Sequence, residues 1–187
     1  MLNDYSGEFI PEIGFESFSK DALIGILKTY AKLYSAVDGF WYLSIMERFN
    51  DDEALACDMW VWERAVNYEL DRLTRLLKIQ GNDVISLMKS FQLSPWFWVF
   101  KYQMEIKDNN HALLTITDCP TLRALEKEGT GREQKICKIV EPMIFQKYAD
   151  YFNSDIEVQY LKIPPRKNKD EICCRWEFSK GRILIKS

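Results

Sequence analysis

The spacing of hydrophobic residues changes near residue 93, and this change constrains the fold more than any other feature. Before it, apolar residues recur every three or four positions, which is typical of amphipathic helices. After it, short segments alternate between apolar and polar residues, which is typical of strands with one buried face. We therefore expect one compact domain, 1–187, with a helical part at 1–92 and a mixed part at 93–187.

The helical part has clear start signals. Ser19 is a suitable N-cap for a helix that runs toward residue 48, which Asp38–Gly39 is expected to kink or interrupt. Asn50 or Asp51 then starts a second long helix, and a short third helix follows before residue 93. The front of the molecule should consist of packed helices.

The mixed part contains four segments that alternate as strands do. They are "FWVFKYQMEI" at 97–106, "ALLTIT" at 112–117, "DIEVQYLKI" at 155–163 and "EICCRWEF" at 171–178. Two helices lie between the strand pairs, and the second is expected to bend or break near Pro142. The order predicts an α+β fold: ββ-αα-ββ with an antiparallel sheet of about four strands and helices mainly on one face.

Charge and hydropathy exclude several classes of partner. A formal net charge of −3 gives no attraction to nucleic acid or to an anionic membrane. No segment reaches the ~18 consecutive apolar residues of a transmembrane helix. The acidic start, "MLNDYSGEF", resembles neither a signal peptide nor a transit peptide. We expect a cytoplasmic protein that contacts neither nucleic acid nor membrane.

The cysteines and histidine limit the catalytic options. The five cysteines are expected to be reduced in the cytoplasm, and they include no C-x-x-C pair. The single histidine, His111, lies in a segment that reads as a hairpin turn. A Ser-His or Cys-His pair would depend on this one turn residue, so the sequence argues against such catalysis.

Strand alternation separates the two adjacent cysteines. Cys174 shares a face with Ile172, Trp176 and Phe178, and this apolar face should point toward the helices. Cys173 alternates with charged residues. It is expected to be the more exposed of the pair, unless a further layer covers it.

Two other cysteines are candidates for chemistry. Cys119 lies at a predicted helix N-terminus, where free amides and the helix dipole stabilise a thiolate. Cys137 and Glu141 are four residues apart and share a helix face. Cys119 and Glu141 are therefore the catalytic candidates. Cys119, Cys137 and Cys174 are the candidate ligands of a metal ion, for which zinc is the candidate. The alternative, favoured by the spacing alone, is that these cysteines pack as small apolar side chains.

Carboxylates and aromatic rings form a second set of candidates. Asp58, Trp62 and Glu69 recur on one stripe of the second long helix, and Asp38 and Glu47 lie on the helix before it. Paired carboxylates can bind a cation or transfer protons, but a solvated face with ion pairs is the favoured alternative. Trp41, Trp62 and Trp176 are candidate ligand contacts, and core packing is the alternative for each.

Five segments together resemble a family of small cytosolic proteins from bacteria and archaea that has no assigned activity. They are "DGFWYLSIMERF", "VWERAVNYELDRL", "DCPTLRALEKEGTGREQKIC", "EPMIFQKYADYFN" and "LKIPPRKNKDEICCRWEF". The resemblance covers nearly the whole chain. It implies the fold class given above and leaves the activity open.

The cysteine frame is also distantly similar to two families of known type. These are the L-2-amino-thiazoline-4-carboxylate hydrolases and the 4-vinyl reductase ligand-binding domain, which share a cysteine after a strand, a helical cysteine and a late cysteine-rich strand. The matching positions are Cys119, Cys137 and Cys173–Cys174. The first resemblance implies opening of a small heterocycle at a C–N bond. The second implies a small-molecule pocket, in which a metal ion is an optional component.

Three functional hypotheses follow from the sequence. The first is a domain that binds a small molecule or a metal in a cysteine-containing pocket. The second is a hydrolase in which Cys119 is the nucleophile or holds a metal, with Glu141 or another carboxylate as the base. The third is a non-catalytic interaction protein whose aromatic helical face forms a homodimer.

Overall fold

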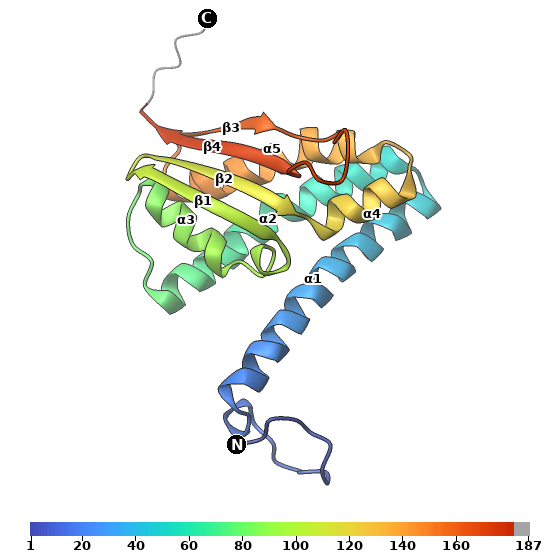
Figure 1. Ribbon diagram of the computed structural model, residues 1–187, viewed down its shortest axis with the longest axis vertical. Helices are drawn as coiled ribbons and strands as arrows, with labels where there is room; N and C mark the ends of the chain where they lie inside the picture. Colours follow the sequence, from blue (N-terminus) through green and yellow to red (C-terminus); the bar gives the residue numbers. More distant parts are fainter. Residues whose placement is uncertain (182–187) are drawn as a thin grey trace, which may run out of the picture.

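The computed structural model of the protein describes residues 1–181 and has the expected α+β architecture (Figure 1). A short 3₁₀ turn, η1 (Phe15–Ser17), precedes the helices. The helices and strands are α1 (Lys20–Arg48), α2 (Asp51–Leu77), α3 (Val84–Leu93), β1 (Lys101–Asp108), β2 (His111–Asp118), α4 (Pro120–Glu128), α5 (Arg132–Phe152), β3 (Ile156–Lys162) and β4 (Cys174–Lys180). A second 3₁₀ turn, η2 (Phe97–Val99), lies between α3 and β1.

The four strands form one antiparallel sheet in the order β1-β2-β4-β3. The pairing register places Met104, Leu114, Trp176 and Tyr160 in one row across the sheet, on the face that the helices cover. The opposite face is mainly polar and carries an ion pair between Glu105 and Arg175 at 3.0 Å. One apolar face and one polar face are what the alternation predicted.

Side-chain caps fix where the long helices begin. The Ser19 hydroxyl accepts a hydrogen bond from the amide of Ala22 at 3.3 Å, and the Asn50 side chain accepts one from Glu53 at 2.9 Å. The expected interruption at Asp38–Gly39 is wrong, because α1 continues through both residues. A single glycine destabilises a helix by only about 1 kcal/mol, and this cost is smaller than the stability of the helical turns on either side.

Two further boundaries differ from the expectation. The first strand begins at Lys101 and not at Phe97, because residues 97–99 form η2 and direct Phe97 into the core. Helix α5 is continuous through Pro142, so the predicted break is absent. Proline removes one backbone donor, and packing of α5 against its neighbours outweighs that loss.

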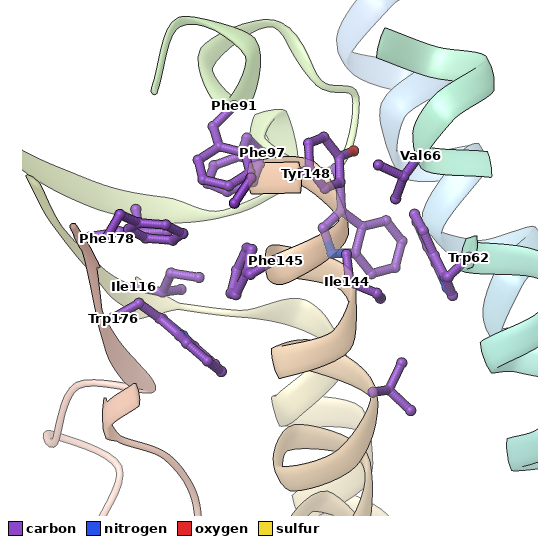
Figure 2. Packing of buried hydrophobic residues seen from close by; sticks show 14 of the residues in the cluster. Trp62, Val66, Phe91, Phe97, Ile116, Ile144, Phe145, Tyr148, Trp176 and Phe178 are labelled. Atoms are coloured by element: carbon purple, nitrogen blue, oxygen red, sulfur yellow. The ribbon is translucent and has the colours of Figure 1, made fainter. Parts of the chain in front are cut away.

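The core is a layer of aromatic side chains between the sheet and the helices. Phe145 of α5 contacts Trp176 and Phe178 of β4, with ring centroids 4.7 and 5.8 Å apart. Figure 2 shows these rings on one side of α5, and Trp62 and Val66 of α2 on its other side. Helix α5 is therefore packed between the sheet and α2.

Helix α1 is arranged differently from the other helices. Its C-terminal part packs on α2, whereas its N-terminal part extends away from the sheet and the other helices (Figure 1). Within residues 1–181, no helix is long and apolar enough to cross a membrane.

Candidate functional site

Three cysteines meet where β2 and β4 approach α4. Cys119 is the N-cap of α4, and its sulfur accepts a hydrogen bond from the amide of Leu122 at 3.3 Å. Ile116 of β2 pairs with Cys174 of β4, and its carbonyl accepts a hydrogen bond from the amide of Cys173 at 2.8 Å. The sheet register thus fixes Cys119, Cys173 and Cys174 at the same end of the sheet.

Helix α5 brings Cys137 and Glu141 to these thiols. The charge of Glu141 contributes to raising the pKa of Cys119, Cys137 and Cys174, although burial is the largest cause for each thiol. Such electrostatic effects require short separations. The four predicted residues Cys119, Cys137, Cys174 and Glu141 therefore gather in one region.

Glu141 also faces two aspartates from the N-terminal helices. Burial raises the pKa of Glu141 to about 7, and the charges of Asp58 and Asp38 add to the effect. Burial likewise raises the pKa of Asp58 to about 7, with a further contribution from Asp38. We name the six residues Asp38, Asp58, Cys119, Cys137, Glu141 and Cys174 the thiol–carboxylate cluster.

The three carboxyl groups of the cluster have no cationic partner among the described residues. None of the ion pairs within residues 1–181 includes Asp38, Asp58 or Glu141. Burial raises the pKa of Asp38 to about 6, and the Trp62 indole opposes this shift. The same indole opposes the shift of Asp58. The cluster is thus poor in positive charge and holds protons close to neutral pH.

The thiols of the cluster are protonated, contrary to the expectation for Cys119. Burial raises the pKa of Cys119 to about 12, whereas its interactions with the amides of Leu122 and Thr121 lower it by less. The helix terminus does act in the predicted direction. Removal of the thiol from water, together with the charge of Glu141, outweighs it.

Cys174 has the orientation that strand alternation predicts, but the exposure of Cys173 does not follow from that alternation. Cys174 lies on the inner face with Trp176 and Phe178, as predicted. Cys173 is only 2% exposed, so the expectation that it is the more exposed cysteine is wrong. The loop of residues 163–173 is the further layer that covers it.

Arg166 holds this covering loop in place. Its guanidinium donates hydrogen bonds to Glu126 of α4 at 2.8 and 2.5 Å, and to the carbonyl of Glu171 at 3.2 Å. The same group lies 3.9 Å from the sulfur of Cys173. The Arg166 side chain is 7% exposed, so it is a buried anchor of the loop.

The three candidate tryptophans occupy different environments. Trp62 is buried next to Asp38 and Asp58, and its ring contacts Trp96 and Tyr34 with centroids 5.1 and 6.4 Å apart. Trp176 is also buried, and its indole N–H has no hydrogen-bond partner among the described residues. This N–H lies beside the Cys174 thiol and lowers its pKa.

Trp41 lies on α1 and is 57% exposed. It is therefore not brought together with Trp62 and Trp176. A ligand contact at each of the three tryptophans stays a prediction.

The interpretation of the acidic helical stripe as a solvated face is wrong for two residues. Asp58 is 8% exposed, and Glu69 accepts a hydrogen bond from the hydroxyl of Tyr148 at 2.8 Å. Glu63, on the same helix, has a side chain that is 53% exposed and that pairs with the exposed Arg64 at 3.8 Å. The sequence favours a solvated role for Asp38 and Asp58; their spacing of four residues from Tyr34 and Trp62 is the signal for burial.

The described residues contain no formed zinc site. Within residues 1–181, no three His, Cys, Asp or Glu side chains are arranged so that they could hold a metal ion. Cys119, Cys137 and Cys174 lie in one cluster, but their sulfurs do not surround a common point at bonding distance. Zinc binding by these residues would require them to move.

Neither of two hollows on the described surface is lined by a residue of the thiol–carboxylate cluster. One, of about 590 Å³, is at the β1–β2 hairpin beside His111 and Lys180. The other, of about 510 Å³, is lined by Arg123, Lys127, Arg166 and Lys169. Its two arginines are already paired with Asp118 and Glu126, so much of its positive charge is neutralised.

Comparison with known families gives one match. The model of a family of unknown function, DUF6125, matches residues 16–180. The chain belongs to this family. The DUF6125 region includes every helix and strand from α1 to β4, and so all six cluster residues. Neither the curated proteins nor the solved structures give a match. Membership in DUF6125 agrees with the resemblance drawn from the sequence, and the function has to be argued from the site.

Proposed function

We propose that the protein binds a small cationic ligand at the thiol–carboxylate cluster. One observation carries the proposal: carboxyl groups from three helices, the buried Asp58 and the half-buried Asp38 and Glu141, act on one another and have no lysine or arginine ion-pair partner among the described residues. The cysteine thiols next to them are uncharged and add no positive charge.

Burial of unpaired carboxyl groups is costly for a fold, and this cost supports a binding role. An ionised carboxylate away from water costs several kcal/mol unless a cation or hydrogen bonds compensate. Proteins avoid this arrangement in ordinary cores, and perturbed carboxyl groups concentrate at functional sites. A bound cation would neutralise Asp58 and Glu141 and recover the cost.

The surroundings favour an organic cation. Trp62, Trp96 and Tyr34 meet edge to face beside Asp38, and rings with an adjacent carboxylate are suited to a protonated nitrogen compound. A protonated 2-amino-thiazoline ring, the type of heterocycle that the distant resemblance implies, is a compound of this kind.

Zinc is the alternative cation, because three thiols are soft ligands and Glu141 is a fourth donor. The described side chains would have to rearrange to bind it. Zn²⁺ and 2-amino-thiazoline are therefore used side by side as probes, and the proposal favours the organic cation.

The first experiment measures the thermal midpoint of the protein with each probe at pH 8, where the carboxyl groups are ionised. We expect 2-amino-thiazoline to raise the midpoint of the wild type and to have little effect on Asp58→Asn and Glu141→Gln. Glu63→Gln, on the exposed side of α2, is the matched control and should behave as the wild type. Equal shifts for all variants, or no shift with either probe, would contradict the proposal.

A second candidate function is hydrolysis of a C–N bond in a small heterocycle. It is favoured by Glu141, whose pKa of about 7 suits a general acid or base at neutral pH and which lies near Cys119. Cys119 as a nucleophile would need a thiolate, but its pKa of about 12 leaves fewer than roughly one thiol in 10⁴ ionised at pH 7.5.

Alkylation tests the role of Cys119 in this candidate. Peptide mass spectrometry after treatment with iodoacetamide at pH 7.5 gives the reaction rate of each cysteine. We expect Cys119 to react at least about 100-fold more slowly than a free cysteine peptide, because so little thiolate is present. Rapid and selective reaction at Cys119 would instead support a nucleophile.

A further inference from the structure

We infer that α1 pairs with α1 of a second copy of this chain, so that the protein is a homodimer joined through its N-terminal helices. The inference rests on the exposed face of α1 and not on the proposed cation site, and Tyr34 borders both. The paired surface, here called the α1 seam, consists of Leu23, Leu27, Tyr30, Leu33, Tyr34, Val37, Phe40 and Trp41.

The apolar side chains of the α1 seam are unusually exposed for a soluble protein. Leu27, Tyr30, Leu33, Val37, Phe40 and Trp41 are between 47% and 69% exposed. Single exposed apolar residues are common on protein surfaces, but a continuous run along five helical turns marks an interaction surface.

The rest of the chain covers little of this helix beyond its C-terminal contact with α2. Only Ala31 and Tyr42 are buried among the 29 residues of α1. The N-terminal part of the helix extends into solvent beyond the sheet (Figure 1). A helix in water is marginal without tertiary packing, so an apolar helix of this length needs a partner.

The spacing of the seam indicates that the partner is another helix. Leu23, Leu27, Tyr30, Tyr34, Val37 and Trp41 follow alternating steps of four and three residues. This repeat of 3.5 residues keeps one stripe of side chains facing a neighbouring helix along its whole length. Leu33 and Phe40 lie next to the stripe and widen it.

The area of the seam is sufficient for a stable dimer. Each of the eight side chains exposes on the order of 100 Å², judged from the size of such side chains and their exposed fractions. The seam then offers roughly 800 Å² per copy, which is the contribution of each partner in a typical specific interface.

A second copy satisfies these requirements by symmetry. Two identical seams related by a twofold axis present the same residues to each other, and homodimers with this symmetry are the commonest assemblies. An anionic membrane is the other surface against which an apolar helix can pack. The net charge of −3 disfavours membrane binding, and binding to vesicles is one outcome of the test below.

The test is sedimentation velocity on the full chain between 1 and 100 μM, a range that brackets the affinity of an interface of this size. We expect a species of twice the 22.1 kDa monomer mass for the wild type. Tyr30→Glu with Val37→Glu places charges in the seam at positions exposed in one copy, so the monomer fold should persist. This variant should weaken the dimer by roughly 100-fold or more. Circular dichroism and tryptophan fluorescence confirm folding.

The matched control is Tyr68→Glu with Leu76→Glu, two exposed apolar positions on α2 outside the seam. It should dimerise as the wild type does. Should Tyr30→Glu with Val37→Glu misfold, Val37→Ala alone is expected to weaken the dimer by roughly tenfold. A monomeric wild type would overturn the inference, as would a dimer unaffected by either seam variant. A monomer that binds vesicles of anionic phospholipid through the seam would overturn it in favour of a membrane.

Discussion

At the scale of single residues, the chemistry of the molecule is dominated by carboxyl and thiol groups that are out of water. Asp58 is the simplest case. It is 8% exposed and has a pKa of about 7. A carboxyl group in the unfolded chain ionises near pH 4. The folded state therefore holds a proton on Asp58 at pH values where the unfolded state has lost it.

This difference predicts the effect of Asp58→Asn on stability. Because the folded-state pKa is raised, stability declines as pH rises from about 4 to about 7 and stays low above that range. Asparagine removes the ionisation. We expect the variant to be more stable than the wild type by about 1–3 kcal/mol at pH 8, and by much less at pH 4.5. Urea unfolding at both pH values measures the free energies.

Glu63→Gln is the control for this measurement, because Glu63 lies on the same helix and is exposed. It should change stability little at either pH. A wild type that is more stable than Asp58→Asn at pH 8 would mean that a cation from the chain or the solution already neutralises the carboxylate.

Residue-level properties were predictable only where one physical effect dominates. Alternation along the strand correctly assigned Cys174 to the apolar face, because side chains two residues apart must lie on the same face of a strand. The acidity of Cys119 was predicted with the wrong sign. A helix terminus and burial act in opposite directions on its pKa, and the extent of burial depends on Glu141 and other groups distant in sequence.

At the scale of elements, the loop of residues 163–173 shows how one buried arginine side chain, that of Arg166, holds a segment in place. Arg166 links Glu126 of α4 to the backbone of the loop, and it closes over Cys173. The loop is rich in lysine and proline, a composition typical of solvated loops. Its attachment to α4 depends on Arg166, a residue that composition does not distinguish from its neighbours.

Replacement of Arg166 should therefore open the loop. We expect Arg166→Ala to lower stability by about 1–3 kcal/mol, since several hydrogen bonds to charged and backbone groups are lost together. We also expect faster alkylation of Cys173. Thermal unfolding and mass spectrometry of the alkylated protein measure the two effects.

Lys167→Ala is the control, because residue 167 is adjacent in the loop and its side chain forms no ion pair among the described residues. Stability and Cys173 reactivity should stay at wild-type values in this variant. An Arg166→Ala protein with an unreactive Cys173 would show that the loop is held by other contacts.

At the scale of the whole molecule, the order of elements was sufficient for the fold class. The change of hydrophobic period separated helices from strands, and short connections made the sheet antiparallel. The candidate site was less accessible to this reasoning. It joins α1, α2, α4, α5 and β4, and their meeting depends on packing that no local pattern encodes. Asp38 and Asp58 look like surface residues until α5 is placed against α2.

The molecule as a whole should be more stable in mild acid than at alkaline pH. The pKa values of Asp38, Asp58 and Glu141 are all raised to between about 6 and about 7, so each adds to the loss of stability between pH 4 and pH 8. The thermal midpoint, measured without ligand, should fall over this range. A constant midpoint would indicate that the three groups are not coupled to folding as described.

The most direct test of the central claim is isothermal titration calorimetry of the wild type with 2-amino-thiazoline at pH 5.5 and pH 8. The account predicts binding that strengthens with pH, and proton release at pH 5.5 that depends on the buffer's ionisation enthalpy. It predicts loss of binding in Asp58→Asn and retention in Glu63→Gln. Binding that is independent of pH and equal in both variants would contradict the claim that the thiol–carboxylate cluster is a cation site.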